Sequence, residues 1–310
     1  MNVRSDTVAD PAIDMPEGAP ALLSPTRPFY WSVRRELWEN RALYLGPLAM
    51  AAVLLFSFLI STIHLPEKMR ELPELPPEAQ YERVLMPYNI AAGLIFIVAF
   101  LVGVFYCADA LHGERRDRSI LFWKSLPVSD RTTVLSKASI PLVVLPLLIY
   151  PITVVTHLLI LLASSAVLLA HGESVAQMWT RLPLFQLWLA VLYALTVTAL
   201  WHAPVYGWLL LVSAWARRVP FLWAVLPPLA IAAFERGAFG ISSFGSLIQY
   251  RLVGWFTLAF SQDPGISAGE PLADLAPGKF LSAPGLWLGL LFTAACLAAA
   301  VRLRRYREPI

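Results

Sequence analysis

Six long apolar runs constrain the fold of this chain more than any other feature of its sequence. An α-helix needs roughly 20 apolar residues to cross the hydrocarbon core of a bilayer, and in lipid the backbone must satisfy its own hydrogen bonds. Hydrophobic residues make up 58% of the 310 residues, and charged residues make up only 15%. We therefore predict an all-α integral membrane protein with six transmembrane helices. The predicted spans are residues 42–63, 88–110, 139–170, 184–216, 219–234 and 284–301.

The distribution of basic residues predicts the direction of these spans. Arginine and lysine gather before the first span, in residues 113–137, at residues 217–218 and after the sixth span. Loops rich in arginine and lysine stay in the cytoplasm. Both termini and residues 113–137 are therefore predicted to be cytoplasmic, in the inner membrane of a bacterium. The loop between the first two spans is acidic instead and contains Glu67, Glu71, Glu74, Glu78 and Glu82.

Two segments precede the first span. Residues 1–28 combine scattered prolines with acidic residues and lack the apolar core of a signal peptide, so we predict a disordered cytoplasmic tail. Residues 29–41 have helical periodicity and are predicted to form an amphipathic helix in the membrane interface. The alternative is a simple lead-in to the first span. The expected apolar face is Tyr30, Val33, Leu37 and Trp38, and the expected polar face is Ser32, Arg35, Glu36 and Glu39.

The fifth span is the least regular of the six. It is short, it contains Pro227 and Pro228, and a segment rich in glycine and proline follows it. We expect a broken fifth helix that enters from the cytoplasm, breaks near Glu235 and leads to short helices inserted at the outer face. The sequence leaves the path of residues 235–283 open.

The patterns that signal catalysis or cofactor binding are missing from the sequence. A G-x-x-x-x-G-K-[ST] loop is absent, so the chain is not expected to bind ATP through a P-loop. Cys107 and Cys296 lie inside apolar runs, with no histidine or cysteine at metal-ligand spacing. The net charge is only +3, and the basic residues occupy short loops, which disfavours nucleic-acid binding. We predict a chain that is not an enzyme and has no catalytic site, metal site or cofactor of its own.

Among the few ionisable residues within or beside the predicted spans, four stand out: His157, His202, Glu235 and Arg236. Such groups are costly in lipid and are functional candidates by default. The alternative is structural, with each histidine bonded to a nearby serine or threonine and Glu235 paired with Arg236 at the outer face. We favour the structural account for both pairs.

Residues 113–137 form the most distinctive loop of the chain. It reads GERRDRSILFWKSLPVSDRTTVLSK, a charged cluster followed by a short apolar run at 120–126 and then by Pro127. Helices usually end before a proline, and Ser129 or Asp130 is a good N-cap for the next helix. The loop therefore predicts a rigid helical corner between the second and third spans.

This corner resembles the coupling helix of ABC-2 type (type V) ABC transporter permeases. The matching residues are Glu114, Arg115, Asp117, Arg118, Ser119, Ile120, Leu121, Ser125, Leu126, Pro127, Val128, Ser129, Val134, Leu135 and Lys137. The resemblance covers roughly residues 29–307 and implies that residues 42–310 form an ABC-2 type transmembrane domain. The alternative is an interfacial helix that rests on anionic lipid. The implied contacts with an ATP-binding subunit are Glu114, Arg115, Arg116, Asp117, Arg118, Phe122, Trp123, Leu126, Pro127 and Val128.

The resemblance also implies an assembly and a task. Two such permeases would form a dimer in the lipid bilayer, and we expect a homodimer. Two copies of a separate ATP-binding subunit would bind this dimer and hold ATP and Mg. The implied task is export of an amphipathic or lipid-linked substrate. One alternative is a membrane scaffold or regulatory subunit of a related complex. Another is an ion-driven secondary transporter, which predicts internal repeats and charges near the midplane. The substrate, the direction of transport and the choice between homodimer and heterodimer are not readable from the sequence.

Overall fold

The computed structural model describes residues 26–125, 128–260 and 272–306. Within these ranges the chain is helical apart from short connections and a β-bridge between Phe260 and Leu275, and it contains no strand. Six helical segments in the described ranges are long and apolar enough to cross a membrane. The prediction of an all-α chain with six apolar segments of membrane-crossing length is confirmed, and these segments indicate a multi-pass membrane protein.

The helices follow one another along the chain with short connections. Two 3₁₀ turns, Thr62–His64 and Leu72–Glu74, and one π-helical turn, Ile140–Val144, lie between them. The α-helices are α1 (Thr26–Glu39), α2 (Ala42–Ser61), α3 (Leu65–Glu71), α4 (Pro77–Asp109), α5 (His112–Arg116), α6 (Ser119–Ser125), α7 (Asp130–Ser139), α8 (Leu145–Ala170), α9 (Ala176–Arg181), α10 (Leu184–Trp215), α11 (Pro220–Phe239), α12 (Ser243–Ala259), α13 (Pro277–Ser282) and α14 (Pro284–Tyr306).

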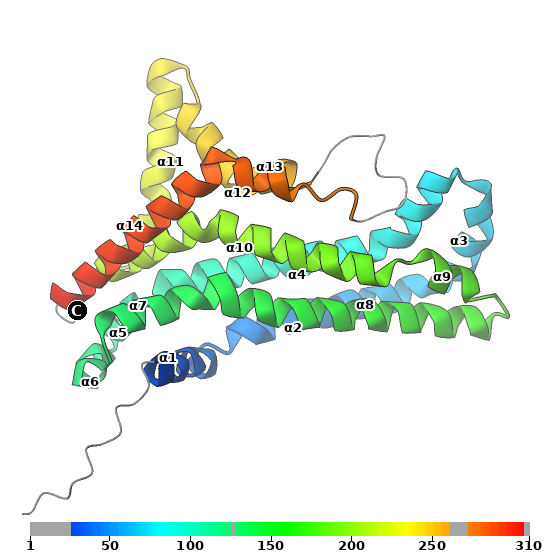
Figure 1. The fold of residues 1–310 in the computed structure, drawn as a ribbon, viewed down its shortest axis with the longest axis horizontal. Helices are drawn as coiled ribbons and strands as arrows, with labels where there is room; N and C mark the ends of the chain where they lie inside the picture. Colours follow the sequence, from blue (N-terminus) through cyan, green and yellow to red (C-terminus); the bar gives the residue numbers. More distant parts are fainter. Residues whose placement is uncertain (1–25, 126–127, 261–271, 307–310) are drawn as a thin grey trace, which may run out of the picture.

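The long helices α2, α4, α8 and α10 lie along a common axis and form the bundle (Figure 1). Helix α14 crosses α10 obliquely, and α1, α5, α6 and α7 gather at the same end of the bundle as the end of α14. Helices α10 and α14 approach closely because Gly207 has no side chain. A Cβ added to Gly207 would lie 3.1 Å from Cγ2 and 3.2 Å from Cα of Thr293. Small residues at such crossings are what let apolar helices pack closely in membranes.

The N-terminal segments differ from their predicted bounds and faces. Of the predicted tail, residues 1–25 lie outside the described residues, and residues 26–28 belong to α1. Helix α1 packs against α7 and turns Val33 and Leu37 toward the core, as expected. Glu36, assigned to the polar face, is 1% exposed and so is not at the surface, whereas Tyr30 and Trp38 of the predicted apolar face are exposed on the outside of the chain.

The third span is longer than predicted because α7 and α8 join into one nearly continuous helical segment. This segment runs for 41 residues from Asp130 to Ala170. The one irregular turn of this segment is the π-helical turn Ile140–Val144, which contains Pro141. A π turn tolerates a missing backbone donor, so the helix continues through the proline.

The predicted break of the fifth helix near Glu235 is wrong. Helix α11 runs without interruption through Pro227, Pro228 and Glu235 and ends at Gly240. Gly240 has a φ of +68°, and its N–H donates to the carbonyl of Arg236 at 3.2 Å. This is a left-handed helix cap, which glycine adopts without steric cost. Helix α12 then returns beside α11, and the two form a hairpin whose turn projects from the bundle while its other end packs on α10 (Figure 1). We call these residues, 220–259, the α11–α12 hairpin.

Candidate functional site

A cluster of ionic side chains is buried at one end of the bundle. Four of its members are 8% exposed or less, with values of 1% for Glu36, 8% for Glu114, 2% for Lys137 and 5% for Arg304. The cluster joins four helices that are far apart in sequence. We call it the ion cluster, and its members are Arg35 and Glu36 from α1, Glu114 from α5, Asp130 and Lys137 from α7, and Arg304 from α14.

Lys137 lies at the centre of the ion cluster. Its Nζ lies 2.7 Å from Oε1 of Glu36 and 3.1 Å from Oε1 of Glu114. Arg35 contacts the same two carboxylates, with Nη2 at 2.8 Å from Glu36 and 2.9 Å from Glu114. Helices α1, α5 and α7 are therefore held together by two cations that share two carboxylates.

Arg304 connects the last helix to this arrangement. Its Nη1 forms an ion pair with Oε2 of Glu114, and its Nε donates to Oδ1 of Asp130 at 3.0 Å. Asp130 is the first residue of α7 and lies beside the N-cap Ser129. The ion pairs of Arg304 thus tie the end of α14 both to α5 and to the start of α7.

The charges of the ion cluster balance, with three cations and three carboxylates. Burial of a charge is costly unless it is paired and hydrogen-bonded, and each buried carboxylate here has several partners. The Tyr106 hydroxyl of α4 also donates to Oε2 of Glu36 at 2.8 Å. Burial raises the pKa of the Glu36 carboxyl, but Lys137 and Arg35 lower it by more, so the pKa lies below its ordinary value of 4.5.

Helix α5 is also fixed to the end of α10 through the backbone. Arg115 donates from Nη1 to the carbonyls of Ala214 at 2.8 Å and Ala216 at 3.2 Å. The hydroxyl of Ser213 accepts hydrogen bonds from the N–H groups of Leu111 at 3.0 Å and His112 at 2.9 Å. The last carbonyls of a helix lack partners within the helix, so Arg115 satisfies groups that α10 leaves open.

Helix α6 has one face turned inward and one face at the surface. Ile120 is 1% exposed, and the guanidinium carbon of Arg35 lies 3.8 Å from the centroid of the Trp123 ring. On the other face, Leu121 and Phe122 are each 59% exposed. Helix α6 therefore combines an exposed apolar surface with a direct contact to the ion cluster.

The structure describes eight of the ten predicted contact residues, and these lie in different settings. Glu114 and Arg115 are buried and are held by partners within the chain, so in this conformation they form no surface for a second protein. Arg116, Asp117 and Arg118 are exposed. Phe122 is exposed, whereas Trp123 is turned toward Arg35.

The corner itself is partly described. Leu126 and Pro127 lie outside the described residues, and Val128 precedes α7. The predicted N-cap is confirmed for Ser129, whose hydroxyl accepts from the N–H of Thr132 at 3.1 Å.

Sequence reasoning missed most of the ion cluster. Glu36 and Arg35 were assigned to a solvated helix face, Lys137 entered only as part of the resemblance, and Arg304 was counted only as a charge that signals orientation. No local pattern marks these residues as partners, because Arg304 and Glu114 are 190 positions apart. The one available signal was the position of Glu36, which is three residues after Val33 and directly before Leu37, the two residues expected on the apolar face.

The intramembrane histidines are bonded to backbone carbonyls. His157 Nε2 lies 3.0 Å from the carbonyl of Tyr88, and His202 lies 2.9 Å from that of Thr198 and 3.2 Å from that of Leu252. The structural account of these histidines therefore fits. The predicted bond to a threonine is confirmed for His202, through the Thr198 carbonyl, whereas His157 is bonded to Tyr88 instead. Both rings connect helices rather than line a described cavity.

The predicted ion pair of Glu235 with Arg236 is also wrong, since neither of these described residues forms it. The carboxylate of Glu235 accepts instead from the N–H of Phe244 at 2.7 Å and so satisfies a donor at the start of α12. A charged contact that the sequence did not predict lies further along α12. Arg251 donates to the carbonyl of Gly285 at 2.9 Å, and its guanidinium carbon lies 4.6 Å from the centroid of the Trp201 ring. Arg251 therefore ties the α11–α12 hairpin to α10 and α14.

Comparison with known proteins finds no matching family model, no matching curated protein and no matching solved structure. The geometry of the ion cluster and of α6 is thus the basis for a functional proposal.

Proposed function

We propose that this chain is the membrane-spanning permease subunit of an ATP-driven exporter. In this proposal the chain has no ATPase site of its own, and a separate ATP-binding subunit supplies ATP and Mg. Helix α6 acts as the coupling helix that docks on that subunit. The observation that carries the proposal is the combination, in one corner, of an exposed apolar surface at Leu121 and Phe122 and a buried ion cluster behind it.

The contacts behind α6 provide a route for mechanical work. A force on α6 reaches Arg35 through the Trp123 ring, and Arg35 shares its carboxylates with Lys137. Lys137 belongs to the 41-residue helical segment that runs the length of the bundle. Close-packed elements joined by buried ion pairs move together rather than deform, so a push at the corner displaces the third span and α14 as units.

The remaining parts of the proposal follow the resemblance. Two copies of the permease pair in the inner membrane of a bacterium, with two ATP-binding subunits on the cytoplasmic side where α1, α6 and the C-terminus lie. The cargo is an amphipathic or lipid-linked molecule moved outward. A scaffold subunit would use the same docking surface but would move no cargo, so a transport measurement separates these two functions.

The test is charge insertion on the exposed face of α6. Phe122→Asp is expected to abolish copurification with the ATP-binding subunit and ATP-dependent transport, because a carboxylate cannot fill an apolar groove. Tyr306→Asp is the matched control, since Tyr306 is a 71% exposed aromatic residue on α14 at the same end of the bundle. This control should bind and transport normally. Unchanged binding and transport in Phe122→Asp would refute the docking role.

A further inference from the structure

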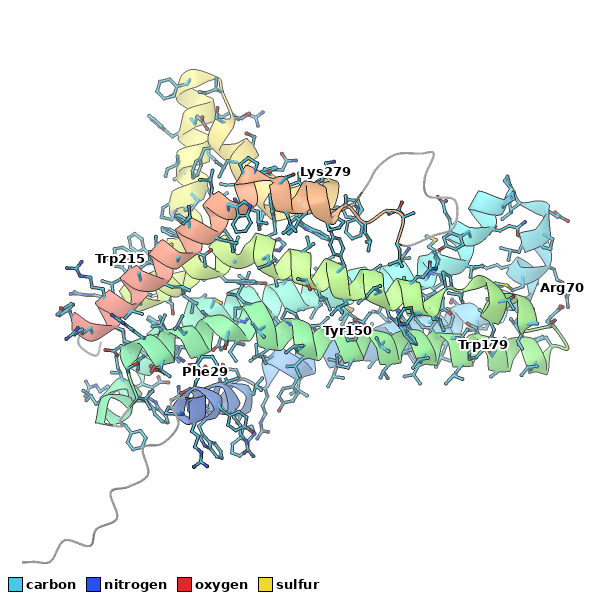
Figure 2. All side chains as sticks on the ribbon, viewed as in Figure 1. Phe29, Arg70, Tyr150, Trp179, Trp215 and Lys279 are labelled. Carbon is cyan, nitrogen blue, oxygen red and sulfur yellow. The ribbon has the colours of Figure 1, made fainter. Side chains whose placement is uncertain are left out.

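A second candidate site lies at the end of the bundle opposite the ion cluster. A cavity of about 400 Å³, open on one side, is lined by residues of α2, α3, α4, α8 and α9. Figure 2 shows Arg70 and Trp179, which label this end, far from Phe29 on α1. Most of its lining is apolar and includes Leu54, Phe58, Met69, Val84, Ala91 and Ile160. A volume of about 300 to 1,000 Å³ with such a lining is typical of ligand pockets.

The cavity opens sideways toward lipid. Met86 and Ile90 line it from α4 and are 59% and 46% exposed, and Ser57 lines it from the exposed face of α2. Only 17% of the most apolar stretch of the segment containing α2 is buried, so most of this stretch lies on the surface of the chain, where a membrane-spanning helix can meet lipid. A hydrocarbon chain can therefore enter between α2 and α4 without crossing water.

Two cations lie at the mouth of this cavity. Lys68 of α3 and Arg83 of α4 both line it, and both are exposed. None of the lining residues in the described part of the chain is acidic, although Glu67, Glu71 and Glu82 are exposed nearby in sequence. Lysine and arginine side chains bind phosphate through charge-assisted hydrogen bonds. The charged groups that line the cavity are therefore both cations, and its interior is apolar.

Tyr88 adds a buried polar group to the wall. It lines the cavity and is 1% exposed, and its hydroxyl has no hydrogen-bond partner among the described residues. A buried hydroxyl without a partner is unusual, because its desolvation is not compensated. The wall of the cavity thus has several hydroxyl groups, those of Tyr88, Ser57, Ser61, Thr62 and Ser164, and two charged groups at its mouth.

We propose that this cavity binds a phospholipid of the surrounding bilayer. One acyl chain occupies the apolar interior, and the phosphate lies at Lys68 and Arg83. The recognised groups are the chain and the phosphate, which phospholipids share whatever their head group. The site is separate from the ion cluster and does not depend on the proposed transport function, so either proposal can fail alone.

Photolabelling of the full-length protein in lipid nanodiscs tests this site. The probes are phosphatidylglycerol and phosphatidylethanolamine with a diazirine in one acyl chain, and diacylglycerol with the same chain. We expect both phospholipids to label residues 54–91 or 160–178, and diacylglycerol to label them at least fivefold less. Equal labelling by diacylglycerol, or labelling elsewhere only, would overturn the proposal.

Variants identify the groups that hold the lipid. Lys68→Gln/Arg83→Gln should reduce labelling at least fivefold, and Ala91→Leu, which fills the cavity, should reduce it similarly. Arg70→Gln is the matched control, because Arg70 is on the same helix but pairs with Glu173 and does not line this cavity. It should label like the unmodified protein. The charged positions are exposed, so the double variant is expected to fold, and unchanged labelling in it would contradict phosphate recognition.

Discussion

The ion cluster and the α11–α12 hairpin are built on opposite principles. The ion cluster joins four helices through shared, buried ion pairs. In the helical segment that begins at its Asp130, 44% of the most apolar stretch is buried. In α11, by contrast, only 6% of the most apolar stretch is buried. Polar contacts of α12 to the bundle include those of Arg251, of the Leu252 carbonyl with His202, and of the Ala259 carbonyl with the Tyr193 hydroxyl. One region is therefore braced within the chain, whereas the other leaves most of its apolar surface to its surroundings.

This difference teaches which part of the molecule can change its packing. Motion at the ion cluster would separate buried charges, which is costly. Motion of the hairpin would separate no buried ion pair among the described residues, and it would occur at a strained junction, since Val219 between α10 and α11 has a φ of +42°. A β-branched residue in the left-handed region stores about 1 to 3 kcal/mol of strain. The structure thus pairs a rigid corner with an element that can be repositioned.

The largest effect is expected from removal of the central cation of the ion cluster. Lys137→Met removes the more deeply buried of the two cations that Glu36 and Glu114 share, at a cost of about 3 to 5 kcal/mol. Thermal unfolding of the purified protein in detergent measures this loss as a lowered Tm. Lys137→Arg, which retains the charge, should lose less. A Tm for Lys137→Met equal to that of the unmodified protein would mean that the ion cluster does not brace the corner.

A smaller effect on stability is expected when glycine is replaced by leucine, and one such variant in the bundle can be compared with one in the hairpin. Gly207→Leu forces α10 away from Thr293 and should destabilise the protein by about 1 to 3 kcal/mol. Gly237→Leu on α11 meets no atom within 4 Å, so it should be neutral or stabilise α11 by about 0.5 to 1 kcal/mol. Denaturant titration of both variants provides the comparison. Equal destabilisation by the two would show that the hairpin packs as tightly as the bundle.

The smallest effect is a dependence of the protein's stability on pH that arises from Glu36 in the ion cluster. Because the folded pKa of Glu36 is below 4.5, its contribution is fully present above that value and is lost as pH falls through the folded pKa. The loss is at most about 1.4 kcal/mol per pH unit for one group. Thermal unfolding of the unmodified protein and Glu36→Gln from pH 7 to pH 3 isolates this contribution. The difference between the two proteins should shrink as the solution is acidified, and a constant difference would contradict the pairing of Glu36.

Much of the fold was predictable because the responsible forces are local. Apolar runs of sufficient length form helices in lipid whatever their neighbours are, and Ser129 caps α7 through its own third following residue. The errors came where local signals competed. Pro227 and Pro228 suggested a weak helix, yet α11 continues past them to Gly240, whose left-handed conformation ends it.

The candidate site was predictable only in its outline. The corner between the second and third spans was found from Pro127 and Ser129, but Glu114 and Arg115 were expected at the surface. Both are buried because their partners, Arg304 and the end of α10, come from distant parts of the chain. Charged runs usually indicate a solvated face, and nothing within the run distinguishes the residues that turn inward.

The sequence by itself determined that this chain is helical, that six segments are long and apolar enough to cross a membrane, and where a capped corner interrupts them. These properties follow from hydrophobicity and backbone hydrogen bonding over stretches of a few turns. The tertiary structure alone decided that Glu36, Glu114, Lys137 and Arg304 meet, and that the turn of the hairpin projects from the bundle. The physical reason is that an ion pair depends on distance in space, and Glu36 and Lys137 are 101 positions apart along the chain.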